Sequence, residues 1–65
     1  MVNIYLHRKR NNFYTIVAMS KLQMSNPIDL KEGSTLVIYR NLDTGQYYIR
    51  PELEFFDGRF EQFNG

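Results

Sequence analysis

The strongest strand signal in the chain is Thr35-Leu36-Val37-Ile38-Tyr39-Arg40-Asn41, a run dominated by β-branched and aromatic residues. Alternate residues of a strand face opposite sides of a sheet, so Val37 and Tyr39 are expected to share one face. The following residues, Leu42-Asp43-Thr44-Gly45-Gln46, include a glycine that can adopt the positive φ of a tight turn. The pattern predicts a strand over 35–41 that enters a hairpin.

The strand after this turn is predicted over Gln46–Arg50, with Tyr48 and Arg50 on one face. Pro51 ends this strand or confines it to a sheet edge, because proline cannot donate to a strand ladder. Farther on, Asp57-Gly58 lies between Phe55-Phe56 and Arg59-Phe60, so aromatic residues stand on both sides of it. Such a dipeptide is a strong turn signal, so it predicts a last short hairpin.

Before the central strand, alternating apolar residues predict a first strand over Val2–Leu6. A polar turn follows over His7–Asn12, where Asn11-Asn12 tolerates a left-handed backbone. Phe13–Met19 is dense in aromatic and β-branched residues and predicts a second strand. Periodicity fades over Ser20–Ser34, which predicts a long loop with at most one helical turn.

Five short strands in 65 residues predict a mainly β fold, a small five-stranded antiparallel SH3-like barrel with one long loop. The whole chain, 1–65, is expected to be one domain. This length is near the lower limit at which a hydrophobic core can keep a chain folded without disulfides or metals. A hydrophobic content of 43% and ten aromatic residues favour folding over disorder.

The chain has no cysteine, which removes disulfides and thiolate chemistry and favours a reducing, cytoplasmic location. No apolar run is long enough to span a membrane, and the first residues lack the layout of an export signal. We find no phosphate loop, metal-ligand spacing or catalytic motif. The expectation is a non-enzymatic protein without a metal or another cofactor.

Charge is distributed unevenly although the net charge is only +1. The first 25 residues contain four cations and no acid, whereas residues 51–65 contain four acids and only Arg59 as a cation. This asymmetry is explained if the two ends of the chain are neighbours in the sheet. The cluster His7-Arg8-Lys9-Arg10 is also a candidate docking site, since a basic turn projects several donors into solvent, although a charged turn can equally serve solubility alone.

Two binding surfaces are candidates. The basic turn 7–10 together with exposed tyrosines would suit nucleic acid, because bases stack on aromatic rings. The candidate stacking residues are Tyr5, Tyr14, Tyr47 and Tyr48. At least half of these tyrosines are expected to lie in the core. The loop 20–34 would suit a protein, because methionines and aliphatic residues on a loop can repack against a partner or plug the barrel. The candidate partner-binding residues are Arg8, Lys9, Arg10, Leu22, Met24, Ile28, Tyr48 and Arg50.

Some polar residues also have a structural interpretation. His7 is expected as an exposed residue at a strand end, with its protonated form disfavoured by Arg8 and Lys9. Glu52 and Glu54 share a face if the segment is extended, so the pair could act in acid–base catalysis or bind a cation. The simpler interpretation is that both carboxylates are solvated on the surface. Arg40 and Arg50 are expected to stack or to pair with Glu52, Glu54 or Asp43.

Several segments in order resemble a small bacterial and phage family catalogued as domain of unknown function 1653. The resemblance lies in Tyr5, His7, Lys9 and Tyr14, in Leu36–Arg40, in Tyr47–Pro51 and in Arg59-Phe60. Residues 20–34 depart from it, being longer than the family's usual connection. The resemblance implies a compact β domain and implies no activity.

We therefore expect a protein-binding adaptor or inhibitor module, with a phage-encoded inhibitor of a host protein as one form suggested by the family's distribution. The alternative is a small nucleic-acid-binding barrel that uses the basic turn and exposed tyrosines. A third possibility is recognition of a small ligand or modified base in the barrel mouth. The oligomeric state is left open.

Overall fold

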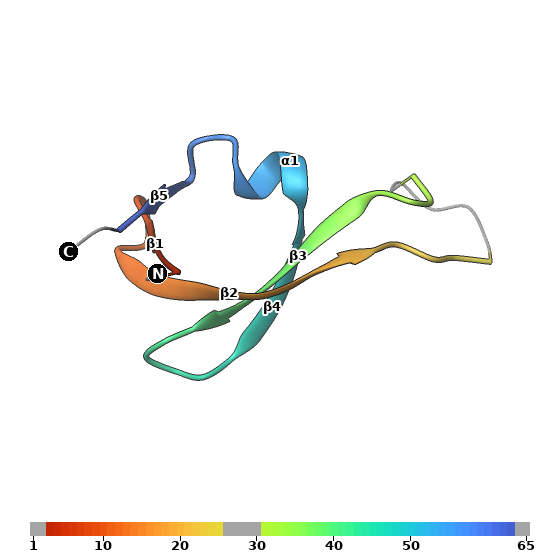
Figure 1. The fold of residues 1–65 in the computed structure, drawn as a ribbon. Helices are drawn as coiled ribbons and strands as arrows, with labels where there is room; N and C mark the ends of the chain where they lie inside the picture. Colours follow the sequence, from red (N-terminus) through yellow and green to blue (C-terminus); the bar gives the residue numbers. More distant parts are fainter. Residues whose placement is uncertain (1–2, 26–30, 64–65) are drawn as a thin grey trace.

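The structure is a computed structural model that describes residues 3–25 and 31–63. Within these residues the elements are β1 (Ile4–His7), β2 (Asn12–Lys21), β3 (Thr35–Asn41), β4 (Tyr47–Pro51), α1 (Glu52–Phe55) and β5 (Phe60–Gln62). The strands form one antiparallel sheet in the order β4-β3-β2-β1-β5 (Figure 1). The prediction of a mainly β fold with five antiparallel strands is confirmed.

The sheet curls into an incomplete ring, so the predicted closed barrel is wrong for the described residues. β4 and β5 are the two edges of the sheet, and no strand pairing within residues 3–25 and 31–63 joins them. Instead, α1 and the turn after it cross from one edge to the other (Figure 1). This connection contains the helical turn α1, and β5 is only 3 residues long.

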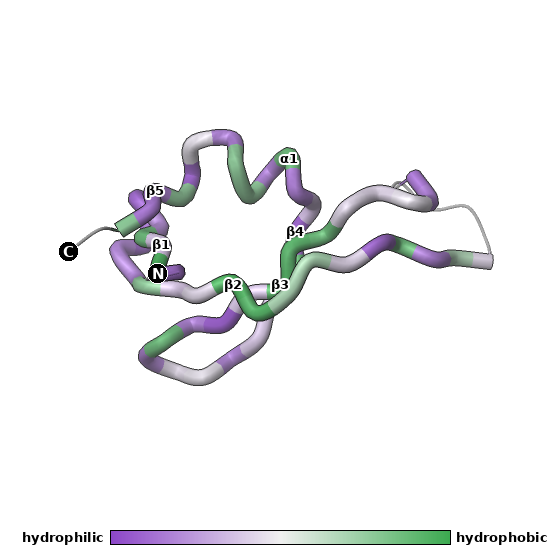
Figure 2. Tube along the Cα trace, in the orientation of Figure 1, coloured by the Kyte–Doolittle hydropathy of each residue, from purple (hydrophilic) through white to green (hydrophobic). Residues whose placement is uncertain are grey.

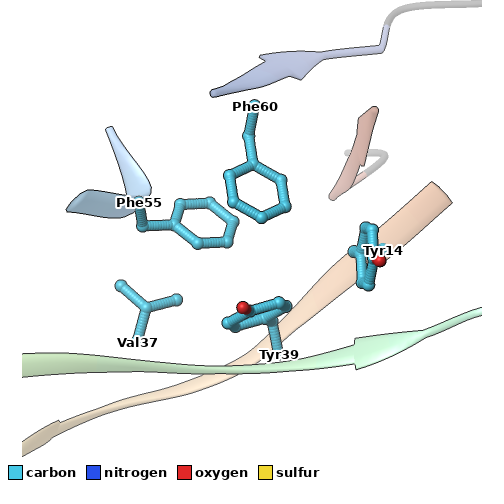
Figure 3. Packing of buried hydrophobic residues seen from close by; sticks show 5 residues of the cluster. All are labelled: Tyr14, Val37, Tyr39, Phe55 and Phe60. Atoms are coloured by element: carbon cyan, nitrogen blue, oxygen red, sulfur yellow. The ribbon is translucent and has the colours of Figure 1, made fainter. Parts of the chain in front are cut away.

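The core lies inside the curl and is mostly aromatic. Its buried members are Tyr14, Val37, Tyr39, Phe55 and Phe60, which come from β2, β3, α1 and β5 (Figure 3). The rings of Phe55 and Phe60 stack with centroids 4.2 Å apart, and Tyr39 meets Phe55 at 5.1 Å. Figure 2 shows hydrophobic residues gathered along the middle of β2 and β3. Large rings give this short chain much buried apolar area from few residues.

Val37 and Tyr39 share the inner face of β3, as the alternation predicts. The bounds of β3 agree with the prediction, and Pro51 ends β4 at a sheet edge, also as predicted. The inner face of β4 carries Tyr48 and Arg50, which lie opposite Tyr39 and Val37 in register. These two side chains therefore point toward the same side as the core.

The predicted last hairpin is wrong. Residues Glu52–Phe55 form one helical turn after Pro51, and the Phe56 N–H donates to the Glu52 carbonyl at 3.1 Å. The turn places Phe55 in the core while Phe56 remains 53% exposed. Gly58 adopts a positive φ of 109°, so a turn does form at Asp57-Gly58 as predicted. This turn joins α1 to β5 and does not join two strands.

The β2 strand is longer than predicted and continues to Lys21, with a bulge between Ile16 and Ala18. Its end pairs with the start of β3, and Leu22 donates to the Ser34 carbonyl at 2.9 Å. The predicted loop therefore begins after Lys21. The end of β2 and the start of β3 project away from the core as the β2–β3 extension (Figure 1). The predicted helical turn near Asp29 lies outside the described residues.

Candidate functional site

The turn between β1 and β2 holds three cations beside the open end of the core. Asn11 has φ 58°, which asparagine tolerates as the sequence predicts, and its N–H donates to the His7 carbonyl at 2.7 Å. The hydrogen bond closes a tight turn over residues 7–11. Arg8, Lys9 and Arg10 lie on the outside of this turn, where all three are exposed. The Arg8 N–H donates to the Arg59 carbonyl at 3.0 Å, which brings a further arginine to the same place.

His7 is buried, so its prediction as an exposed residue is wrong. It lies opposite Phe60 of β5, and the two rings meet edge to face with centroids 4.8 Å apart. Its Nδ1 accepts the Arg10 N–H at 3.1 Å, which leaves the proton of the neutral ring on Nε2. Burial first, and then the positive charges of Arg10 and Arg50, lower the pKa of His7. The ring is therefore a neutral donor at neutral pH.

Arg50 is fixed over the core from the β4 side. Its Nε donates to the Tyr39 hydroxyl at 3.1 Å, and one terminal nitrogen lies 3.2 Å from a Glu54 carboxylate oxygen. Its guanidinium carbon lies 5.7 Å from the centroid of the Phe60 ring. The hydrogen bond that Arg50 donates to the Tyr39 hydroxyl is the largest cause that raises the pKa of Arg50. The predicted pairing of Arg50 with a nearby glutamate is confirmed, and the charge stays on the guanidinium.

These residues surround a two-part pocket. The outer basin has a volume of about 360 Å³ and is lined by His7, Arg8, Lys9, Arg10, Arg50 and Arg59. The inner cavity has a volume of about 110 Å³ and is lined by His7, Arg10, Tyr14, Tyr39, Tyr48, Arg50 and Phe60. Because three residues line both parts, the basin continues into the cavity. Cations thus surround the entrance, and aromatic rings form the floor.

Carboxylates near the basin neutralise only part of its charge. Arg8 pairs with Glu61 at 2.8 Å, and Arg59 pairs with Asp57 at 3.1 Å and with Glu54 at 3.4 Å. Among the described residues, neither Lys9 nor Arg10 forms an ion pair with a carboxylate, and no acidic residue lines either part of the pocket. The pocket therefore presents a positive potential suited to an anion.

The structure brings together five of the predicted partner-binding residues: Arg8, Lys9, Arg10, Tyr48 and Arg50. Leu22 and Met24 lie instead on the β2–β3 extension, where they line a separate hollow with Lys21, Gln23, Ser25, Glu32 and Gly33. Ile28 lies outside the described residues. The two surfaces predicted from the sequence are thus separate, and only the pocket combines charge with aromatic rings.

Glu52 and Glu54 do not form an extended carboxylate pair. Both belong to α1, where residues two apart do not face each other, and Glu54 is occupied by Arg50 and Arg59. The predicted acid–base or cation role for this pair is therefore not supported by the geometry. In the part of the chain that the structure describes, no three metal-ligating side chains form a cluster.

The sequence did not indicate Tyr39, Arg59 or Phe60 as pocket residues, whereas His7 belonged to the predicted basic turn 7–10. Tyr14 was a candidate for base stacking, but it is buried and contributes its ring to the core. Arg59 reaches the pocket because β5 pairs with β1. The charge asymmetry between the two ends of the chain was the available signal, since it predicted that these ends are neighbours.

Comparison of the chain with protein-family models, with curated proteins and with solved structures found no match. The resemblance to the domain of unknown function 1653 therefore stays a prediction. Within residues 3–25 and 31–63, no helix is long and apolar enough to cross a membrane.

Proposed function

We propose that this domain binds single-stranded nucleic acid, with phosphates in the outer basin and one base against Tyr48. The observation that carries the proposal is the meeting of five cationic side chains and an exposed tyrosine at one pocket. Phosphates are drawn to clustered arginine and lysine, whereas bases stack on aromatic rings. A nucleic acid supplies both groups at neighbouring positions along the chain.

Tyr48 has the features of a stacking platform. Tyr48 is 41% exposed, and its ring stacks on that of Tyr39 with centroids 5.7 Å apart and planes 29° from parallel. Tyr14 supports it edge-on at 6.3 Å. A ring held by two buried tyrosines loses little conformational freedom when a base covers it, and such stacking contributes about 1–3 kcal/mol per base.

The domain is proposed to act by binding alone and to have an SH3-like arrangement. The strand order β4-β3-β2-β1-β5 and the helical turn between β4 and β5 support that arrangement. We place the domain in the cytoplasm, as the absence of cysteine favours.

The test is binding of a fluorescently labelled single-stranded oligonucleotide, followed by anisotropy over a range of salt concentrations. Lys9→Ala should weaken binding and reduce the slope of log affinity against log salt by about 0.7, the value for one lost phosphate contact on a single strand. Lys21→Ala is the matched control, because Lys21 is an exposed lysine at the far end of β2. No measurable binding at low salt, or equal effects of the two variants, would refute the proposal.

A second candidate function is binding of a protein through the β2–β3 extension. The observation that favours it is the hollow lined by Leu22 and Met24, which lies on a part of the molecule that projects from the core (Figure 1). A partner on this extension would leave the cationic pocket free. Protein capture from a lysate treated with nuclease should then persist in Lys9→Ala and disappear when Leu22 and Met24 are both changed to serine.

A further inference from the structure

The inner cavity ends in buried side chains. Tyr14, Tyr39 and Phe60 line it and are only 5%, 4% and 9% exposed, so a group that enters from the basin cannot continue through the far side. The cavity volume of about 110 Å³ is less than a third of the 360 Å³ of the outer basin, so the cavity has room for a small group only. This space suits a single tetrahedral or planar oxyanion better than a nucleobase with its sugar.

Two neutral donors open into this cavity. In the described residues, no side-chain nitrogen or oxygen is both fully buried and without a hydrogen-bond partner. Neither Nε2 of His7 nor the Tyr14 hydroxyl forms a hydrogen bond to a described residue, so both atoms must reach solvent. Both residues line the cavity, so their rings lie beside it. Each atom can therefore donate to a bound group.

Two cations complete the set of donors. Arg50 lines the cavity with its guanidinium held by Tyr39 and Glu54, and Arg10 lines it from the turn between β1 and β2. Two charged and two neutral donors around a space of this size match the oxygens of a phosphate group, since donors to an anion make the stronger hydrogen bonds. The buried rings below lower the local dielectric constant, which strengthens these contacts.

We propose that the inner cavity binds the terminal phosphate of a nucleic-acid strand, so that the domain recognises strand ends. This inference rests on the proposed function and adds the chemical class of the group that the cavity recognises, a phosphate monoester. An internal phosphodiester is linked to the strand on both sides, whereas a small cavity with a floor of buried rings best fits a group attached to the strand on one side. A terminal phosphate also carries up to one further charge and a third free oxygen.

The test compares oligonucleotides of one sequence that carry a 5′-phosphate, a 3′-phosphate or hydroxyl groups at both ends. One of the phosphorylated strands should bind about tenfold more tightly than the unphosphorylated strand, as expected for two or more additional hydrogen bonds to an anion. Inorganic phosphate at millimolar concentration should reduce this preference, because it competes for the same cavity.

Tyr14→Phe removes only the hydroxyl and should reduce the preference for the phosphorylated strand severalfold. Tyr5→Phe is the matched control, because Tyr5 packs against Phe55 and Phe56 and lines neither part of the pocket. Equal affinity of all three strands would overturn the inference and leave the proposed function standing. Absence of binding by any strand would overturn both.

Discussion

Replacement of Phe55 by alanine is expected to remove much of the stability of the domain. Phe55 is 0% exposed, and its ring contacts Phe60, Tyr39 and Tyr5 at centroid distances of 4.2, 5.1 and 5.3 Å. Truncation of a buried phenylalanine to alanine costs about 3–5 kcal/mol. A chain of 65 residues has a total unfolding free energy of only about 3–10 kcal/mol. Phe55→Ala is therefore expected to lose a third of its stability or to unfold.

The neighbouring residue supplies the matched control. Phe56 is 53% exposed, so Phe56→Ala should change the unfolding free energy by less than about 1 kcal/mol. The assay is urea denaturation followed by far-ultraviolet circular dichroism, and Phe55→Leu provides a folded variant if the alanine variant does not fold. Equal losses for Phe55→Ala and Phe56→Ala would refute the assignment of α1 as the element that delivers one phenylalanine to the core.

Two further predictions concern the polar groups around the pocket. The lowered pKa of His7 means that the unfolded chain binds more protons, so stability should fall as the pH decreases from 7.5 to 5.5, through the usual His pKa near 6.5. His7→Phe lacks the only histidine, so its urea midpoint should change less over this pH range; equal changes would contradict the assignment. Arg50→Lys keeps the charge but cannot reproduce the contacts to Tyr39 and Glu54, which should cost about 1 kcal/mol in the same denaturation assay. An unchanged midpoint would show that these contacts contribute nothing to the fold.

The strands were predictable where local chemistry alone decides the structure. Thr35–Asn41 forms a strand with the predicted bounds because nearly every residue in it favours extended backbone. The helical turn at Glu52–Phe55 was missed because Asp57-Gly58 between aromatic residues also fits a hairpin. Four residues are too short for a helical period to appear in the sequence.

The candidate site was only partly predictable because it depends on contacts between distant parts of the chain. Arg8, Lys9 and Arg10 were recognised as a local cluster, and Tyr48 and Arg50 were assigned to one face by alternation. The burial of His7 and the position of Arg59 follow from the pairing of β1 with β5, which joins residues near opposite ends of the chain. Local patterns do not specify such a pairing.

The most direct test of the pocket as the ligand site is a titration of the ¹⁵N-labelled protein with a single-stranded, 5′-phosphorylated oligonucleotide, followed by amide chemical shifts. We predict shift changes at Arg8–Asn11, at Tyr48–Arg50 and at Arg59, with the amides of Leu22–Met24 unchanged. Changes confined to Leu22–Met24, or no changes at millimolar oligonucleotide, would contradict the account.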